Sequence, residues 1–358
     1  MHRCRDPLHC LLTPAVLENV ARNGDESQRD WAVRALNRDQ SIRLARVQNA
    51  KVRGRGPREG ADALAVEPTA KANRIIYDAE GAEKVRGRSV RREGDKPTGD
   101  TAADEAYDGF GDTFNFFLEA YGRNSIDDEG MPLRGVVHFG AQYPNAFWDG
   151  KRMVFGDGDG QILGRMTASL DVIGHELGHG VTEDEAALEY FGQSGALNES
   201  MSDVFGSLVK QRKLNQTAEQ ADWLIGSEVW TPDIAGDALR SMKAPGQAYD
   251  DPLVGKDPQP AHMRDYIDTI DDNGGVHLNS GIPNHAFYVV ATQLGGYAWE
   301  RAGRIWYEAL RHPTLKSTSG FRRFARLTRR VAGRLYGRDS GEVKAVQGGW
   351  EAVGLQLR

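Results

Sequence analysis

The segment Asp171–His179 carries the strongest chemical signal in this chain. His175 and His179 are four residues apart, and Glu176 directly follows the first of them. On a helix, positions i and i+4 lie one turn apart on the same face, so both imidazoles can reach one zinc ion. A carboxylate beside an open metal position can take a proton from water. The spacing predicts a zinc centre, although a surface helix with two unrelated histidines would have the same pattern.

A zinc centre of this kind needs a third protein ligand, and the segment 196–206 offers one. Glu199 and Asp203 have helical spacing and small or apolar neighbours, which disfavours a merely solvated acidic pair. We expect Glu199 to be the ligand and Asp203 to accept the second N–H of His175. Asn198, next to the expected ligand, is predicted to support the centre as well.

A histidine could instead supply the third ligand, as in the extended metzincin motif. That motif requires glycine at position 182 and histidine at position 185. The sequence has Thr182 and Glu185 there, which excludes this alternative.

Hydrophobic periodicity predicts the elements that must position these residues. Residues 13–48 are expected to form two amphipathic helices, with Thr13 as the first N-cap and an Asp25–Gln28 capping box opening the second. Between 74 and 165 the pattern is mixed, with a helix at 102–121 and strands at 74–77, 136–139 and 152–155. Further on, helices dominate, and we predict them at 168–182, 196–212, 283–294, 298–311 and 320–336.

Length and composition restrict the class of protein. A chain of 358 residues suggests two lobes plus a tail, and its net charge of -6 disfavours a nucleic-acid binder. No apolar stretch approaches the ~20 residues needed to cross a membrane. The two cysteines, Cys4 and Cys10, lie near the start, so no disulfide is expected in the body. Cys10 could be a blocking metal ligand or an unpaired thiol. We expect a monomer.

The N-terminal region differs from the rest in charge. Residues 1–60 hold 12 Lys/Arg and 7 Asp/Glu, a balance of +5 on a body of -11. This asymmetry could help a leader dock, or it could be an ordinary charge bias. We expect four parts: a prosegment at 1–50, a linker with a processing site at 51–73, an N-terminal catalytic lobe at 74–184 and a helical lobe at 185–358. Without a signal-peptide pattern, we expect secretion by another route, or a cytoplasmic location before release.

Several motifs in the same order resemble the thermolysin family of gluzincins over residues 74–358. They are the run HELGHGVT, the NExxSD segment, and the segments 145–148, 154–160 and 272–281. Residues Leu11–Pro14 and the stretch DESQRDWAVRAL resemble the prosegment of protealysin-like precursors. That family often has a Pro-Pro pair where this chain has only Pro14, which leaves open how the leader would occlude the site.

The resemblance implies an α+β, two-lobed thermolysin-like fold with the active-site helix between the lobes. It also implies a neutral metalloendopeptidase that is made as a precursor and acts on protein or peptide substrates. Glu176 would be the general base, and Tyr190 and His277 would stabilise the oxyanion. Asp272 would orient His277 and favour its protonated form. Without the resemblance, a packing tyrosine and a turn histidine would explain the last pair equally well.

The substrate-binding residues also follow from the resemblance. Asn145 and Ala146 would hold the substrate as an added strand, and Arg240 would bind a substrate carbonyl. The pocket for the residue after the cleaved bond would be apolar, which predicts a preference for bulky hydrophobic residues there. Its wall would be formed by Met166, Val172, Ile225 and Leu239.

Calcium sites are where the chain departs from the family. A lysine and two non-carboxylate residues stand among the double-calcium positions, so we expect that site to be absent. These positions are Asp171, Lys210, Asp222, Leu224 and Ser227. A single-ion site at Thr231, Ile234 and Asp237 is left open.

Two rival functions are considered. One is a non-catalytic binding protein that zinc stabilises. The other is a metallo-aminopeptidase, which would need an acidic residue to bind the free amine of its substrate, and no such residue is visible in the sequence.

Overall fold

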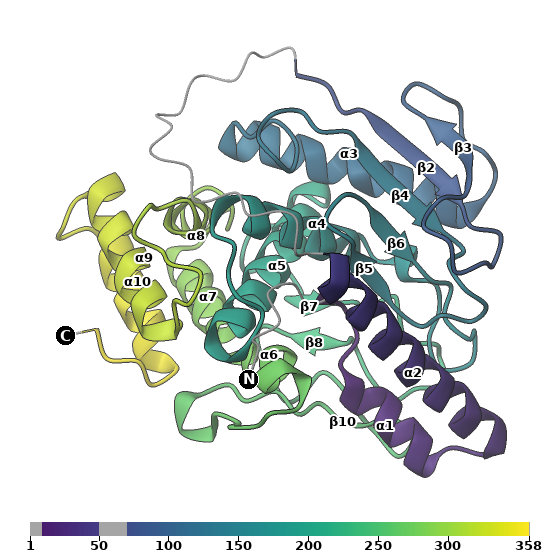
Figure 1. Ribbon diagram of the computed structural model, residues 1–358. Coiled ribbons are helices and arrows are strands. Elements are labelled where there is room, and N and C mark those ends of the chain that lie inside the picture. Colours follow the sequence, from purple (N-terminus) through teal and green to yellow (C-terminus); the bar gives the residue numbers. More distant parts are fainter. Residues whose placement is uncertain (1–8, 50–69, 358) are drawn as a thin grey trace.

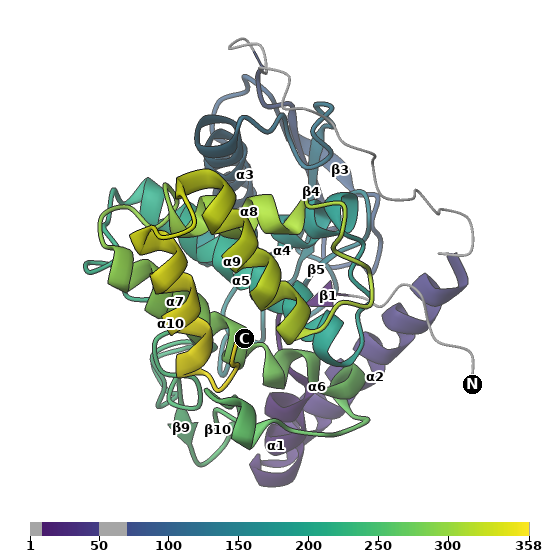
Figure 2. The same cartoon turned by 90° about the vertical axis from the view of Figure 1, so that its left-hand side faces the viewer.

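The computed structural model describes residues 9–49 and 70–357 of the chain. The body has a β-containing lobe and a helical lobe, with the long helices α4 and α5 packed between them (Figure 1). Turning the molecule by 90° shows α7, α9 and α10 grouped on the helical side, away from the sheet (Figure 2). The predicted α+β class is confirmed.

The β-containing lobe is built on a six-stranded mixed sheet in the order β1-β5-β6-β4-β2-β3. Strands β2, β4 and β6 run parallel, while β1 and β5 form the antiparallel edge next to β6. The six strands are β1 (His9–Cys10), β2 (Arg74–Asp78), β3 (Arg88–Arg92), β4 (Leu133–Val137), β5 (Ala146–Trp148) and β6 (Met153–Phe155). Two short ribbons pair β7 (Leu224–Ile225) with β8 (Arg240–Ser241) and β9 (Asp250–Asp251) with β10 (Gly255–Lys256).

Helix α3 (Thr101–Tyr121) packs against the sheet through its apolar face. Asp100 caps its N-terminus by accepting a hydrogen bond from the amide of Ala103, and Gly122 ends it in the left-handed conformation. Phe110, Phe114 and Phe117 are buried on the inner face, as the spacing predicts.

The remaining helices of the body come after β6 in the chain. The first two, α4 and α5, lie between the lobes, and the later ones belong to the helical lobe (Figure 1). These helices are α4 (Leu170–Glu185), α5 (Gly192–Lys213), α6 (Asp272–Asn279), α7 (Gly281–Leu294), α8 (Ala302–Leu310), α9 (Phe321–Tyr336) and α10 (Gly341–Ala352). The apolar stripe of α9 is buried and its arginines lie on the other face, so this helix is an ordinary core helix. Within the described ranges, no helix is long and apolar enough to cross a membrane.

Three differences from the predicted elements have local causes. The strand predicted at 136–139 ends at Val137, because His138 adopts φ 54° and turns the chain. The helix predicted from 298 begins at Ala302. Helix α10 and strand β3 were not predicted; β3 is rich in arginine and α10 contains a Gly-Gly pair, so neither has a clear apolar period.

The described N-terminal segment, residues 9–49, is called the leader below, and residues 70–357 are called the body. The leader forms a helical hairpin that lies against the body. Helices α1 (Pro14–Asn23) and α2 (Glu26–Asn49) are both as expected, and Asp25 and Gln28 form the predicted capping box with two bonds of 2.9 Å. Thr13 occupies the cap position of α1, but its hydroxyl makes no capping hydrogen bond. The buried leader side chains belong to the same core cluster as the body, and they include Leu11, Leu12, Val16, Leu17, Val20, Trp31, Ala32 and Ala35.

His138 links two acidic turns at one end of the sheet. Its Nδ1 lies 2.8 Å from Asp157 and its Nε2 3.0 Å from Asp100. The bond to Asp157, followed by the nearby charges of both carboxylates, raises the pKa of His138 to about 9 against the loss from burial. A raised pKa contributes stability that is complete below pH ~6.5 and is lost as the pH rises through 9.

We therefore expect the free energy of unfolding to fall by about 2 kcal/mol between pH 6 and pH 10, with much of the loss due to His138. Urea unfolding of the chain and of His138→Asn at both pH values measures this. Asparagine tolerates the left-handed backbone but does not titrate. A pH dependence that is unchanged in the variant would contradict the assignment.

Candidate active site

The close approach of helices α4 and α5 brings the predicted metal ligands together. A side chain at Gly174 would place its Cβ 3.0 Å from the Cα of Gly206, and one at Gly178 would place it 3.1 Å from the Cα of Ser202. A Cβ at Gly206 would lie 2.3 Å from the carbonyl oxygen of Asp171. The absence of side chains on these three glycines allows the two backbones to touch.

Across this contact, His175, His179 and Glu199 converge and are fully buried. The Nε2 atoms of the two histidines are 3.0 Å apart. Glu199 places one carboxylate oxygen 3.5 Å from Nε2 of His175 and the other 3.3 Å from Nε2 of His179. In the described part of the chain, this is the one group of three such residues whose ligand atoms lie within 4.8 Å of one another.

The outer nitrogens of both rings face acceptors. Nδ1 of His175 lies 2.7 Å from Asp203, and Nδ1 of His179 lies 2.8 Å from the side-chain oxygen of Asn198. With the proton of each ring on Nδ1, both Nε2 lone pairs are directed at the same point as Glu199. Three buried acceptors directed at one point need a cation, and two imidazoles with one carboxylate suit Zn²⁺.

Asp203 supports this centre and is itself held by a cation. Arg240 donates to its carboxylate from Nε at 2.9 Å and from Nη2 at 2.8 Å. Burial would raise the pKa of Asp203, but the charge and the hydrogen bonds of Arg240 outweigh it and hold the pKa well below its usual range. Asn284 adds a bond of 2.8 Å to the same carboxylate. Sequence reasoning missed Asn284, since nothing in the pattern around it points to the metal.

Glu176, the predicted base, is fully buried on α4 directly after His175. Because Glu176 is buried between the lobes, its carboxylate is shielded from bulk water. A carboxylate in such a place can exchange protons with a bound substrate.

A second group of side chains contacts Glu199, and it consists of Tyr190, His277 and Asp272. The Tyr190 hydroxyl donates to Glu199 and lies 3.1 Å from Nε2 of His277. Asp272 accepts from Nδ1 of His277 at 2.6 Å and from its backbone amide at 2.8 Å. Burial lowers the pKa of His277, but the Asp272 and Glu199 carboxylates outweigh it, so the pKa is raised overall.

An unusual backbone places the Asp272–His277 pair. Four successive residues, Asp272 to Gly275, have φ between 50° and 81°. Glycine adopts this region freely, but Asp272 and Asn273 do so at a cost, which is typical of functional sites. The turn brings the Asp272 carboxylate next to the backbone nitrogen and Nδ1 of His277, which is five positions later in the chain.

The N-terminal segment of the chain contacts the predicted substrate-binding residues Asn145, Ala146 and Arg240. Strand β1 pairs antiparallel with the edge strand β5, with Cys10 opposite Phe147. Beyond it, the amide of Leu12 donates to Oδ1 of Asn145 at 3.0 Å, and the amide of Leu11 lies 3.4 Å from the carbonyl of Ala146. Nη1 of Arg240 donates to the Leu11 carbonyl at 2.8 Å. The structure thus brings the three predicted substrate-binding residues together on one extended segment.

The four predicted pocket residues are buried in the core cluster that also contains the fully buried Leu11. Ile225 pairs with Arg240 across the β7–β8 ribbon, and its carbonyl accepts from the amide of Leu239 at 3.0 Å. Met166 and Val172 come from the short helix Met166–Ala168 and from α4.

The positions of the double-calcium site, which we expect to be absent, include Lys210, and its side chain supplies positive charge there. Its ammonium group lies 2.9 Å from Asp171 and 2.9 Å from Asp222. Burial would lower the pKa of Lys210, but the two carboxylates raise it well above its usual value.

The glycine contact between α4 and α5 can be tested by Gly206→Ala. We expect the added methyl to push the helices apart, to cost about 1–3 kcal/mol of stability and to remove most of the bound zinc. Metal analysis and thermal unfolding of the purified chain measure both effects. Gly341→Ala is the matched control, because no atom lies within 4 Å of its would-be Cβ. Full zinc content in Gly206→Ala would show that the contact does not set the metal geometry.

Comparison with known proteins agrees with this geometry. Residues 64–183 match the thermolysin metallopeptidase catalytic domain, and residues 186–355 match the thermolysin metallopeptidase alpha-helical domain. An extracellular metalloprotease of Pectobacterium carotovorum subsp. carotovorum is 50% identical over 352 residues, which is 98% of each chain. Thermolysin of Alicyclobacillus acidocaldarius subsp. acidocaldarius is 40% identical over 263 residues, 72% of this chain and 46% of that one.

Among solved structures, the precursor of protealysin, a metalloproteinase from Serratia proteamaculans, superposes with a TM-score of 0.87 at 50% identity. It covers 97% of this chain and 99% of that one. The two family matches together span most of the chain. The chain belongs to the thermolysin family of metallopeptidases and is a metalloendopeptidase.

Proposed function

We propose that this metalloendopeptidase is made as a precursor whose leader fills the substrate groove, and that it acts outside the cell once the leader is removed. The observation that carries the proposal is the path of residues 9–12, which add a strand to β5 and engage Arg240 and Asn145 as a substrate would. The relatives named as an extracellular metalloprotease and as a protealysin precursor support both parts.

The proposed reaction is the hydrolysis of an internal peptide bond. Zn²⁺ held by His175, His179 and Glu199 supplies a Lewis acid and lowers the pKa of water when it is bound. Glu176 takes the proton of the attacking water and passes it to the leaving nitrogen.

The scissile carbonyl oxygen gains negative charge during attack, and the site has two donors for it. The Tyr190 hydroxyl and Nε2 of His277 lie 3.1 Å apart, so both can donate to one oxygen. The raised pKa of His277 favours the protonated, donating form of the ring. Asp272 is a positioning residue, because it holds the opposite nitrogen of that ring.

The proposed specificity is for a bulky hydrophobic residue after the cleaved bond. In the precursor, Leu11 is the residue whose carbonyl binds Arg240, and its side chain is fully buried in the core cluster that also contains the four pocket residues. A charged side chain in that place would lose its hydration without gaining a partner.

We further propose that the double-calcium site of the family is replaced by an internal ion pair. A lysine ammonium between Asp171 and Asp222 balances the carboxylates that would otherwise bind a cation. Leu224 and Ser227 contribute no carboxylate there. The single-ion site at Thr231, Ile234 and Asp237 is not part of this proposal.

The catalytic role of Glu176 is tested by Glu176→Gln. We expect kcat for casein or a peptide to fall about 10³-fold after the leader is removed, while the zinc content stays unchanged. Glutamine keeps the size of the side chain but cannot take a proton at neutral pH. The exposed Glu219→Gln is the matched control. Equal activity in the two variants would show that Glu176 is not the base.

The specificity is tested with peptides that differ only in the residue after the cleaved bond. We expect leucine to exceed aspartate by at least about 10²-fold in kcat/KM. Leu239→Ala should enlarge the pocket and shift the preference from leucine toward phenylalanine by about 10-fold. Leu335→Ala, which truncates an exposed leucine on α9, should leave the ratio unchanged. The pocket assignment would be wrong if both variants gave the same ratio as the unmodified enzyme.

A further inference from the structure

A buried carboxylate of the leader forms hydrogen bonds with body residues next to strand β5. Asp39 on α2 is only 7% exposed. Its Oδ1 accepts from the Tyr143 hydroxyl at 2.7 Å, and its Oδ2 accepts from Nδ2 of Asn145 at 3.1 Å. Both donors are fully buried and belong to the body. A carboxylate is rarely buried without such bonds, so this contact is a built feature of the interface.

The bond to Asn145 determines which way its amide group faces. An ionised carboxylate only accepts hydrogen bonds, so Asp39 requires the NH₂ side of the amide. The amide oxygen must then face the other way, where it accepts from the amides of Leu12 and Ala146, each at 3.0 Å. Asp39 therefore holds Asn145 in the orientation that binds Leu12.

Other side chains on the same face of α2 contact the same segment. Trp31 donates to the carbonyl of Gln142 at 3.0 Å, and Arg38 donates to the carbonyl of Ala141 at 3.3 Å. These two bonds go to backbone carbonyls, which any sequence presents. Arg38 also forms an ion pair with Glu83 of the body at 2.7 Å. Asp39 differs from both because one of the two body side chains that it contacts, Asn145, also binds the leader strand.

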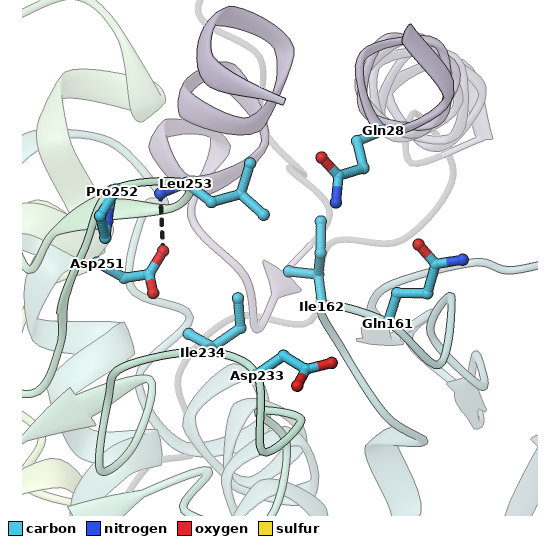
Figure 3. Close-up of a pocket in the computed structure, with 8 residues that line it drawn as sticks. All are labelled: Gln28, Gln161, Ile162, Asp233, Ile234, Asp251, Pro252 and Leu253. Carbon is cyan, nitrogen blue, oxygen red and sulfur yellow. Dashed lines mark hydrogen bonds between the residues drawn. The ribbon is translucent and has the colours of Figure 1, made fainter. Parts of the chain in front are cut away.

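The N-terminal end of α2 is packed less closely. Gln28 borders a cavity of about 450 Å³ whose other walls are body loops with Ile162, Ile234 and Leu253 (Figure 3). The carboxylate of Asp251 at its edge is already engaged with the backbone amide of Leu253 at 2.7 Å. The buried polar contact with body side chains therefore lies in the middle of the helix, at Asp39.

We propose that Asp39 is the positioning residue by which the leader recognises the substrate groove. It orients Asn145 for the leader strand and is lost from the enzyme when the leader departs. This inference rests on the proposed function only in that the groove beside Asn145 is the substrate groove. The docking contact itself can be measured without any catalytic activity.

The test uses the full chain carrying Glu176→Ala, so that self-cleavage does not contribute, and adds trypsin. We expect Asp39→Ala to raise the rate of cleavage at the arginines of α1 and α2 at least 10-fold, because two buried donors lose their acceptor. Asp30→Ala is the matched control: it removes the same charge from an exposed position on the same helix. Zinc content and the trypsin resistance of the body show that the variants are folded.

A second variant examines the contact from the body side. Tyr143→Phe keeps the ring packing and removes one donor, and we expect it to raise the same cleavage rate. Combined with Asp39→Ala, it should add less than its separate effect, since the two groups share one bond. Cleavage of Asp39→Ala at the rate of Asp30→Ala, or fully independent effects of Asp39 and Tyr143, would overturn the proposal. Absence of peptidase activity in the unmodified enzyme would instead refute the proposed function and leave this result standing.

Discussion

The direct contact between the backbones of α4 and α5 is the constraint on which the site depends. The glycines at 174, 178 and 206 allow it, and it sets the distance between the histidines of one helix and Glu199 of the other. A methyl group at any of the three would contact the neighbouring helix and push it away. Because protein interiors are closely packed, a displacement of one helix also displaces the side chains packed against it. The metal geometry is therefore determined by helix packing as much as by the ligands themselves.

The same two helices connect the metal ligands with substrate binding. Asp203 on α5 accepts from His175 and from Arg240, and Arg240 in turn donates to the carbonyl of Leu11. One buried carboxylate thus contacts a predicted metal ligand and the arginine that is proposed to bind the substrate. Its negative charge is balanced by the guanidinium, just as Asp171 is balanced by Lys210. Asp203 and Asp171 are thus buried carboxylates that each have a fixed cationic partner.

The leader uses the interaction expected of a substrate and adds a helical hairpin to it. An added strand on β5 satisfies the exposed edge through backbone bonds, which any peptide can make. The hairpin contributes apolar side chains to the core of the body, and Asp39 contributes bonds to Tyr143 and Asn145. These contacts distinguish the leader from a passing peptide, because a short substrate has no second element with which to reach them.

Much of this arrangement could be predicted from local spacing in the sequence. The i,i+4 pairs on α4 and α5, the capping box before α2 and the apolar stripe of α9 depend on neighbours a few residues apart, and all are present. Strand β3, helix α10 and the turn at His138 lacked a clear apolar period or a local turn signal.

Contacts between distant segments could not be inferred from such patterns. Nothing in the sequence links Asp39 with Tyr143 or Asn284 with Asp203. Each pair is separated by many residues and meets only when the lobes and the leader pack. The sequence by itself determined the donor types and their helical spacing, because local geometry decides those. Only the tertiary structure decided which buried charge meets which partner, because burial and proximity arise from long-range packing.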